Sequence, residues 1–299
     1  MTNRSPVVLV TGVSSGIGRA IASAFAAKGF EVFGTSRNPR TTEPVAGVEL
    51  VQLDVTDDAS VTAAISTVVQ RAGRIDILVN NAGAGVFGAA EETSISQAQQ
   101  LFETNFFGLA RLTREVLPYL RAQRSGRVIN IGSVLGFLPS PYGSLYAASK
   151  HAVEGYSESL DHETREFGVR VSVVEPGYTN TSFEANATDA DSPIDSYAPI
   201  REHVKQVIAK AIRAGDDPAV VAQAVLRAAT SRTPKLRYPA GPLARRLALL
   251  KKYAPAGLLD NGIRKANKLT KAPKPDVASK AQVPQKVWYV PKSSGAGLA

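Results

Sequence analysis

A tyrosine and a lysine stand four residues apart in GSLYAASKHAV, at Tyr146 and Lys150, with mainly small residues between them. In a helix, residues at positions i and i+4 lie one above the other on the same face. A phenol and an ammonium placed in this way can act on one small volume, and the ammonium is expected to lower the phenol pKa from its usual value of about 10. The same spacing also arises by chance on surface helices, so other features of the chain are needed to tell a functional pair from a chance one.

A glycine-rich turn, TGVSSGIG, lies between an apolar run and a helical pattern. Gly12 permits a tight turn, Gly16 lets the backbone approach a pyrophosphate, and Gly18 allows close packing of helix on strand. The helix N-terminus then offers N–H groups and the positive end of its dipole to phosphates. Many strand–helix turns contain two glycines, and it is the position directly after an N-terminal strand that favours dinucleotide binding.

The end of the second apolar run reads GTSRNPR, with Ser36 and Arg37 and no acidic residue. An acid at this point hydrogen-bonds the ribose 2′-hydroxyl of NAD, whereas an arginine suits a 2′-phosphate. The guanidinium fork also matches phosphate geometry. The segment therefore favours NADP(H) over NAD(H), the alternative being a solvated arginine in a turn.

Apolar, β-branched runs alternate with helical patterns through most of the chain. Continuous apolar strands of this kind indicate a parallel sheet covered by helices on both faces, an α/β doubly wound Rossmann fold. In such sheets ligands bind at the carboxyl ends of the strands. We expect strands over 6–11, 30–36, 48–55, 75–83, 127–133, 169–177 and 235–239, and helices over 17–29, 58–73, 94–124, 145–167 and 217–231.

Residues 178–200 are rich in Asn, Thr, Asp, Ser and Pro, and we expect a mobile segment over the site. Phe183, Ile194 and Tyr197 lie in it, which favours an apolar substrate such as a lipid or a polycyclic alcohol. We expect one catalytic domain over 1–240, including a substrate segment at 178–212. A basic helical extension over 241–299 follows, poorly ordered from 273 onward.

The charge of the chain is divided unevenly. From Arg232 onward there are 15 lysines and arginines against two acids, a net +13, so the first 231 residues carry −4 of the total +9. A nucleic-acid-binding function for the whole protein is therefore excluded. The chain has no cysteine, which rules out disulfides and thiol chemistry and fits a cytoplasmic protein. MTNRSPVVLVTG has the pattern of a first strand and lacks the cleavage pattern of a signal peptide.

The stretch LARRLALLKKYAPAGLL at 243–259 has leucines and basic residues interleaved at helical spacing. One interpretation is a helix that packs its apolar face on the subunit and leaves Arg245, Arg246, Lys251 and Lys252 in solvent. The other is weak peripheral contact with an anionic membrane, which would suit an apolar substrate.

These features together resemble the compact short-chain dehydrogenase/reductases. The shared motifs, in the family's order and spacing over residues 6 to about 240, are TGVSSGIG, LDV at 53–55, NNAG at 80–83, Asn105, Ser133, YAASK at 146–150 and the Pro176–Gly177 pair. The run at 233–255 is similar to the later part of 17β-hydroxysteroid and retinol dehydrogenases. The resemblance implies hydride transfer between a carbonyl and an alcohol, in a homodimer or homotetramer built through helices near 101–124 and 146–167.

The resemblance also assigns roles to individual residues. Tyr146 would be the general acid/base, Lys150 would lower its pKa and hydrogen-bond the nicotinamide ribose, and Ser133 would hold the substrate oxygen. Capping of a strand end by the Ser133 hydroxyl is disfavoured by its 13-residue step to Tyr146. Asn105 would anchor a water relay from Lys150 to solvent, although a lone helical asparagine is often structural.

The implied cofactor contacts lie at the ends of several strands. Asp54 would contact the adenine, Thr179 and Thr181 would touch the nicotinamide amide or the phosphates, and Asn80 would be both structural and cofactor-lining. The full set is Gly12, Ser14, Ser15, Gly16, Ile17, Gly18, Arg37, Asp54, Val55, Asn81, Ala82, Gly83, Tyr146, Lys150, Pro176, Gly177, Thr179 and Thr181.

Other polar groups are given no catalytic role. His151, His162 and His203 form no metal-binding pattern, and no metal site is expected. The pairs Glu91–Glu92 and Asp216–Asp217 are interpreted as solvated loop and cap charges. Two other functions stay open: a nicotinamide-using lyase or epimerase, and a cofactor-binding regulatory or scaffold protein without turnover. The intact set of Ser133, Tyr146, Lys150 and Asn105 favours an NADP(H)-dependent oxidoreductase acting on an apolar carbonyl or alcohol.

Overall fold

Seven parallel strands form one sheet in the order β3-β2-β1-β4-β6-β7-β9. The computed structural model describes residues 5–183 and 187–269. The order reverses direction between β1 and β4, which is the topological switch point where doubly wound sheets bind ligands. The strands are β1 Val7–Val10, β2 Glu31–Ser36, β3 Val48–Gln52, β4 Ile77–Asn80, β6 Gly126–Ile131, β7 Val169–Pro176 and β9 Arg237–Ala240.

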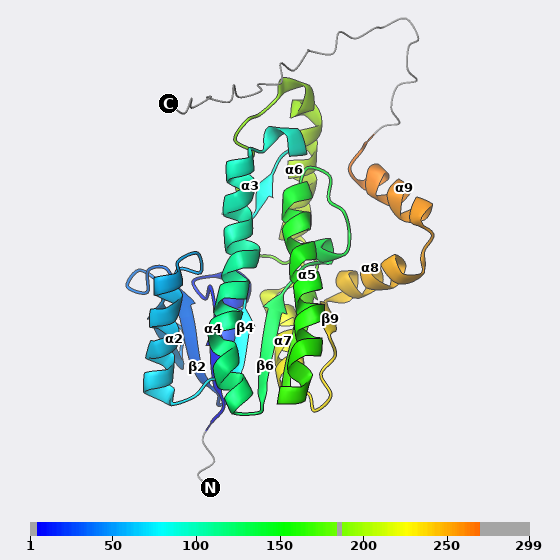
Figure 1. Cartoon of the computed structure of the whole chain (residues 1–299). Coiled ribbons are helices and arrows are strands. Elements are labelled where there is room, and N and C mark those ends of the chain that lie inside the picture. The colour runs from blue at the N-terminus through cyan, green and yellow to red at the C-terminus, as the bar shows by residue number, and fades with distance from the viewer. Residues whose placement is uncertain (1–4, 184–186, 270–299) are drawn as a thin grey trace, which may run out of the picture.

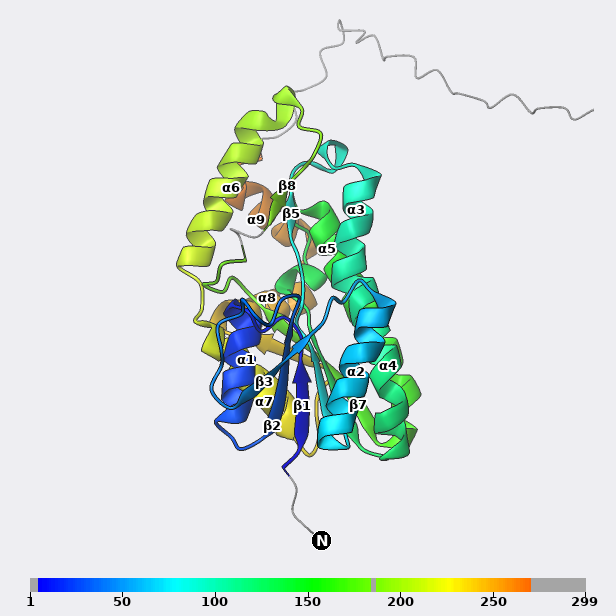
Figure 2. The same cartoon turned by 90° about the vertical axis from the view of Figure 1, so that its left-hand side faces the viewer.

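Helices cover both faces of this sheet (Figure 1 and Figure 2). One face carries α1 (Gly16–Ala26) and α7 (Pro218–Thr230), and the other carries α2 (Asp58–Ala72), α4 (Gly108–Ala122) and α5 (Ser144–Thr164). All four residues of β1 and all four of β4 are buried, because each strand is covered on two sides. The predicted Rossmann fold is confirmed.

The helix ends follow local chemistry. The Asp57 side chain caps α2 by accepting from the backbone N–H groups of Ala59 and Ser60, and Gly73 ends the same helix in the left-handed region at φ 78°. Asp217 caps α7 in the same way, with Pro218 in its first turn. The interpretation of Asp217 as a cap residue is therefore confirmed.

A second layer of structure stands above the carboxyl ends of the strands. It contains an additional helix, α6, where only an irregular segment was expected, because Val204, Ile208 and Ile212 recur every fourth residue and bury one face. The elements of this layer are β5 Val86–Phe87, η1 Ala90–Glu92, α3 Ile95–Phe102, the π-helical turn η2 Glu103–Phe107, η3 Val134–Gly136, β8 Thr188–Asp189, η5 Asp195–Tyr197 and α6 Ala198–Arg213. The short helix η4 Arg165–Phe167 extends α5 at the far end of the sheet.

Glu92 anchors this layer, and its interpretation as a solvated charge is wrong. The side chain is fully buried and pairs with Arg201 of α6. It also accepts from the backbone N–H of Ile194 at 2.8 Å and from that of Ala89 at 2.8 Å. The expected mobile segment is thus fixed at one end by a buried carboxylate.

Two helices follow the last strand and stand away from the sheet (Figure 1). They are α8 (Pro242–Tyr253) and α9 (Ala256–Ala266), and we refer to them together as the C-terminal arm. The helical pattern expected over 243–259 is broken at Pro255, which cannot continue a helix. The tail from 273 onward lies outside the described residues. Within the described ranges, no helix is both long enough and apolar enough to span a bilayer.

Candidate active site

A cavity of about 1590 Å³ opens at the carboxyl ends of the strands, beside the switch point between β1 and β4. Ser133 and every residue of the predicted cofactor set line it, from the glycine turn at one side to Thr179 and Thr181 at the other. Its volume exceeds the several hundred Å³ of an ordinary ligand pocket. The space therefore fits a dinucleotide together with a second molecule.

The glycine turn has the backbone geometry that phosphate binding needs. Gly12 and Gly16 adopt φ values of 70° and 56°, in the left-handed region that glycine tolerates best. A Cβ on Gly18 would lie 2.1 Å from the carbonyl oxygen of Gly12, so no larger residue fits there. Asn81 supports the turn from β4, since its Nδ2 donates to the carbonyls of Thr11 at 2.9 Å and Gly12 at 3.1 Å. Together with the N-terminus of α1, the turn forms a cradle that fits a pyrophosphate.

The segment after β7 lies across this cradle. A Cβ on Gly16 would lie 3.2 Å from the side chain of Thr181, and the Ser182 hydroxyl donates to Ser15 Oγ at 3.3 Å. The Phe183 ring then stacks near Tyr146, with 5.8 Å between ring centroids. This segment therefore connects the phosphate end of the cavity to its catalytic end.

The adenosine end of the cavity is bordered by Arg37, Asp54 and Val55. Arg37 is exposed, and no carboxylate in the described part of the chain pairs with it. The Asp54 carboxylate turns into its own loop, where it accepts from the backbone N–H of Thr56 at 2.9 Å and from the Thr56 hydroxyl at 2.7 Å. These hydrogen bonds, and then the positive charge of Arg37, hold the pKa of Asp54 below its ordinary value. A free guanidinium at this position fits an added phosphate.

The pKa of Tyr146 differs from the expectation. Burial raises the pKa of Tyr146 to about 12, and the hydrogen bond with Ser133 offsets this only in part. The Ser133 hydroxyl also accepts from the backbone N–H of Leu135 at 3.1 Å, so it caps the start of the short helix η3. Ser133 is thus held in place by the backbone while its hydroxyl meets the phenol.

Lys150 explains why the phenol pKa is not lowered. Its Nζ donates to the carbonyl oxygen of Ile131 at 2.9 Å and lies 5.8 Å from the centroid of the Tyr146 ring. Burial lowers the pKa of Lys150 itself to about 8, against the opposing effect of the Glu154 charge. At this separation the burial of the phenol outweighs the attraction of the ammonium.

Two asparagines have structural roles behind the cavity. Asn105, in the π-helical turn, is buried, and its amide bonds the backbone N–H and carbonyl of Ala84 at 2.7 and 3.0 Å and the Ser149 hydroxyl at 3.0 Å. Its side chain is fully engaged, so a water relay at this residue would need its backbone. Asn80 donates to Thr113 and Asn130 and does not line the cavity, so its predicted cofactor-lining role is wrong.

The other end of the cavity is apolar, and most of this wall was not predicted. Phe183 was expected near the substrate, but the contributions of η3, α6 and the C-terminal arm were not. The repeat of apolar residues at helical spacing in α6 and α9 was the available signal. The apolar side chains here are Leu135, Leu138, Phe183, Ile208, Ile212, Leu247, Leu250, Leu258, Leu259 and Ile263.

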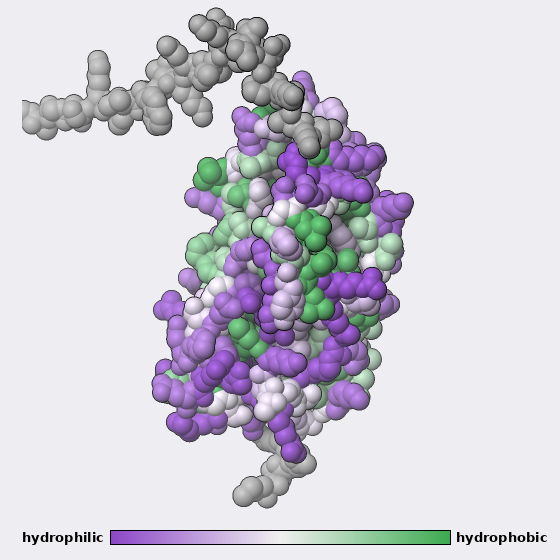
Figure 3. All heavy atoms as spheres, turned by 90° about the vertical axis from the view of Figure 1, so that its right-hand side faces the viewer, coloured by the Kyte–Doolittle hydropathy of each residue, from purple (hydrophilic) through white to green (hydrophobic). Residues whose placement is uncertain are grey.

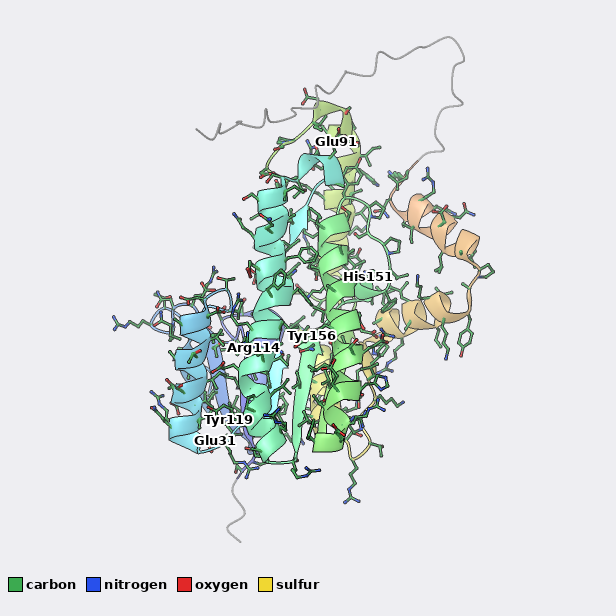
Figure 4. All side chains as sticks on the ribbon, in the orientation of Figure 1. Glu31, Glu91, Arg114, Tyr119, His151 and Tyr156 are labelled. Carbon is green, nitrogen blue, oxygen red and sulfur yellow. The ribbon has the colours of Figure 1, made fainter. Side chains whose placement is uncertain are left out.

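The histidines lie away from this site or make local contacts. His151, labelled in Figure 4, is exposed on α5, and its Nδ1 lies 2.9 Å from the carbonyl oxygen of Ala147. Within the described residues no group of three or more His, Asp or Glu side chains has the arrangement of a metal site.

Comparison with known proteins identifies the family. The model of the short chain dehydrogenase family matches residues 6–192. The 3-ketodihydrosphingosine reductase of Bacteroides thetaiotaomicron is 36% identical over 261 residues, which cover 86% of this chain and 96% of that protein. Human retinol dehydrogenase 8 is 36% identical over 256 residues, covering 77% of this chain and 79% of that protein. The chain belongs to the short-chain dehydrogenase family and is a carbonyl/alcohol oxidoreductase that binds a nicotinamide cofactor and acts on a small molecule.

Solved structures of the family share the fold. A short-chain dehydrogenase from Streptomyces avermitilis is 36% identical with a TM-score of 0.76, over 90% of this chain and 97% of that one. A family member from Burkholderia phymatum in complex with NAD is 26% identical with a TM-score of 0.72, over 84% and 95% of the two chains. A metagenomic family member in complex with NADP is 29% identical with a TM-score of 0.61, over 78% and 95%. Both nicotinamide cofactors therefore occur among the structural relatives.

Proposed function

We propose that this protein is an NADPH-dependent reductase of a ketone attached to a long apolar chain. The observation that carries the proposal is the continuity of one cavity, which runs from the glycine turn past Tyr146 to the wall built by η3, α6 and the arm. The 3-ketodihydrosphingosine reductase and the retinol dehydrogenase among the relatives are named for substrates that also join an oxygen function to a long apolar chain.

A nicotinamide bound in the cavity would supply the hydride to the carbonyl carbon. Ser133 would donate a hydrogen bond to the carbonyl oxygen, and Tyr146 would give that oxygen its phenolic proton, which completes the alcohol. Tyr146 carries this proton at neutral pH, because burial raises its pKa above the ordinary value of a phenol. Lys150 would then return a proton to the phenolate, as its pKa of about 8 permits.

The preference for NADPH is proposed on the basis of Arg37. This guanidinium borders the adenosine end, has no described carboxylate partner, and stands where an acid would select NAD. Its positive charge is available to a 2′-phosphate.

The substrate class is tested by NADPH oxidation with straight-chain ketones of increasing length. Each methylene that enters the apolar wall contributes about 0.8 kcal/mol, so kcat/KM should rise about three- to four-fold per added carbon until the wall is filled. Retinal, a steroid ketone and a sugar aldehyde serve as comparison substrates. Equal rates at every length, or a preference for the sugar, would contradict the proposal.

The C-terminal arm favours contact with an anionic membrane, because its outer surface is both apolar and basic. Five of the eight large apolar residues exposed in the described ranges lie on it, and two of them, Leu250 and Leu258, also border the cavity; the other three are Leu243, Leu249 and Tyr253. Figure 3 shows hydrophobic atoms bordered by hydrophilic ones in the upper half of the side where the arm stands. Over 242–269 there are seven lysines and arginines and one acid. We propose that this surface rests on anionic lipid while its inner leucines line the cavity.

Vesicle sedimentation with the full chain tests this contact. The wild type should bind vesicles that contain phosphatidylglycerol and not pure phosphatidylcholine, at about 0.15 M salt. The variant Lys251→Glu/Lys252→Glu should lose more than about ten-fold in binding, since each basic residue near such a surface contributes about 1 kcal/mol. The control Lys28→Glu/Arg232→Glu makes the same charge change at two exposed sites of the opposite end. An equal loss of vesicle binding in the two variants would show that binding depends only on net charge and would contradict the proposal.

Assembly and location are proposed in line with the family. The outward face of α4 and α5, where Figure 4 labels Arg114, Tyr119 and Tyr156, carries an aromatic cluster. The Phe106 ring meets those of Phe107 and Tyr156 edge to face, with 5.2 and 5.8 Å between ring centroids, and Phe107 is 49% exposed. This face supports a homodimer or homotetramer, which sedimentation of the purified chain would reveal, and a monomer would refute. A cytoplasmic location stays a prediction from the absence of cysteine.

A further inference from the structure

Two glutamates lie buried directly behind the catalytic residues. Glu154 is one helical turn beyond Lys150 on α5, and Glu175 is the penultimate residue of β7, just before the Pro176–Gly177 pair. Their side chains are 5% and 1% exposed. Buried carboxylates are rare unless they are paired, so this pair requires an explanation.

One guanidinium serves three carboxylates at this point. Arg237 Nε of β9 lies 3.0 Å from Glu154 Oε2 and 3.2 Å from Glu175 Oε1, and its Nη2 lies 3.0 Å from Glu158 Oε1. Only the contact with Glu154 has the geometry of a hydrogen bond from Nε. Glu154 Oε1 and Glu175 Oε1 are buried without a hydrogen-bond partner among the described residues. The acidic charge therefore exceeds the positive charge that compensates it.

Two buried carboxylates that share one cation cannot both ionise easily, so one of them retains a proton. Burial raises the pKa of Glu154, while the hydrogen bond from Arg237 and the charge of that arginine favour the ionised form of this carboxylate. Burial, followed by the charge of Glu154, raises the pKa of Glu175 to about 8. Glu175 is therefore the member that holds the proton at neutral pH, and Glu154 is its charged partner.

Glu154 also contacts the catalytic segment. A Cβ built on Gly132 or on Gly136 would lie 2.9 or 3.0 Å from Glu154 Oε1, so this carboxylate fills the space under the two glycines that bracket Ser133. Its charge supports the protonated form of Lys150 against the effect of burial. The charged groups that face the pair are thus Lys150, His151 and Glu158 of α5 and Arg237 of β9.

We propose that Glu154 and Glu175 are positioning residues that share one proton and sustain the positive charge of Lys150. They touch neither substrate nor cofactor and act through Lys150. The pair thereby extends the pH range over which Lys150 can return a proton to Tyr146.

The pH profile of kcat/KM with NADPH tests the proposal. Glu154→Gln keeps the shape of the side chain and removes its charge, so the alkaline fall in activity should move down by roughly one pH unit. Glu154→Asp keeps the charge, so its activity should fall at the same alkaline pH as that of the wild type. Glu158→Gln is the matched control, because this half-exposed residue pairs with the same arginine, and its profile should not move. A uniform loss at every pH in Glu154→Gln, or an unmoved profile, would overturn the proposal.

Two measurements on the protein without substrate keep this inference separate from the proposed function. Carbon-13 NMR of labelled glutamate should show one carboxyl titrating near pH 8, absent in Glu175→Gln. Between pH 4.5, the ordinary pKa of a glutamate, and about pH 8, Glu175 is more protonated in the folded protein than in the unfolded chain, so wild-type stability falls as the pH rises through this range. Glu175→Gln should lack this fall and melt above the wild type at pH 8. Without such a titrating carboxyl the shared proton does not exist.

Discussion

Replacing Tyr146 with phenylalanine is expected to lower the turnover of ketone and NADPH by about a hundred- to ten-thousand-fold, the usual contribution of a positioned proton donor. The loss follows from the geometry, because the phenol lines the cavity and forms a hydrogen bond with Ser133. The fold should survive, since Ser133 keeps its hydrogen bond from the backbone of Leu135. Stopped-flow kinetics would measure the effect of the variant on hydride transfer, and NADPH fluorescence would measure its effect on cofactor binding.

Tyr142→Phe is the matched control for this variant. Tyr142 lies four residues earlier, stacks on Tyr197 at 6.2 Å and does not line the cavity. Its hydroxyl should be dispensable for turnover. Retention of activity in Tyr146→Phe would contradict the assignment of Tyr146 as the proton donor. Tight NADPH binding by a wild type that turns over no ketone would favour a regulatory protein of the same fold.

Replacing Arg37 with aspartate is expected to reverse the cofactor preference. Loss of the charge-assisted contacts to a 2′-phosphate should lower kcat/KM with NADPH by roughly ten- to a hundred-fold. The new carboxylate should improve the use of NADH, since it can accept from the ribose 2′-hydroxyl. Initial rates with both cofactors at saturating ketone would give the ratio directly.

Arg40→Asp makes the same change of charge three residues further along the exposed loop, outside the cavity. Its effect should be small with either cofactor. If the two variants behave alike, the loop contributes only its net charge, and the selection of NADPH must come from other residues. A wild type that prefers NADH would refute the interpretation of Arg37.

The sequence was sufficient for the sheet and for the cofactor half of the cavity because both depend on local signals. A β-branched run followed by glycines and a helix can form few structures other than a strand, a tight turn and a helix. Only glycine fits at position 18, because a Cβ there would lie 2.1 Å from the backbone oxygen of Gly12. Tyr146 and Lys150 could be recognised because one helix sets their spacing. Ser133 and Asn81 needed the family pattern, since Tyr146, which meets Ser133, lies on α5, and the backbone partners of Asn81 follow β1.

The apolar half of the cavity could not be predicted in the same way. Leu258 and Ile263 line it only because the chain turns at Pro255, so that α9 rises above α8 (Figure 1). Such a contact is set by tertiary packing and has no local signature. The same limit explains Glu92, whose neighbours in sequence look solvated, while the partner that buries it, Arg201, lies 109 residues away.

The spacing of Tyr146 and Lys150 predicts which groups lie together but not the direction of the Tyr146 pKa shift. Positions i and i+4 place Lys150 on the correct face, and the expected direction of its effect on a phenol is right in principle. The structure adds the burial of both groups and the carbonyl of Ile131, which holds the ammonium 5.8 Å from the ring centroid. Desolvation then decides the sign of the pKa shift.

The most direct test of the account is the rate of NADPH oxidation by the wild type across straight-chain ketones of increasing length. The cavity that joins the glycine turn to the leucines of the arm predicts that kcat/KM climbs with each carbon, by about three- to four-fold per methylene, and then levels off. Rates that are independent of chain length, or highest for a small polar carbonyl, would show that the apolar wall does not bind substrate.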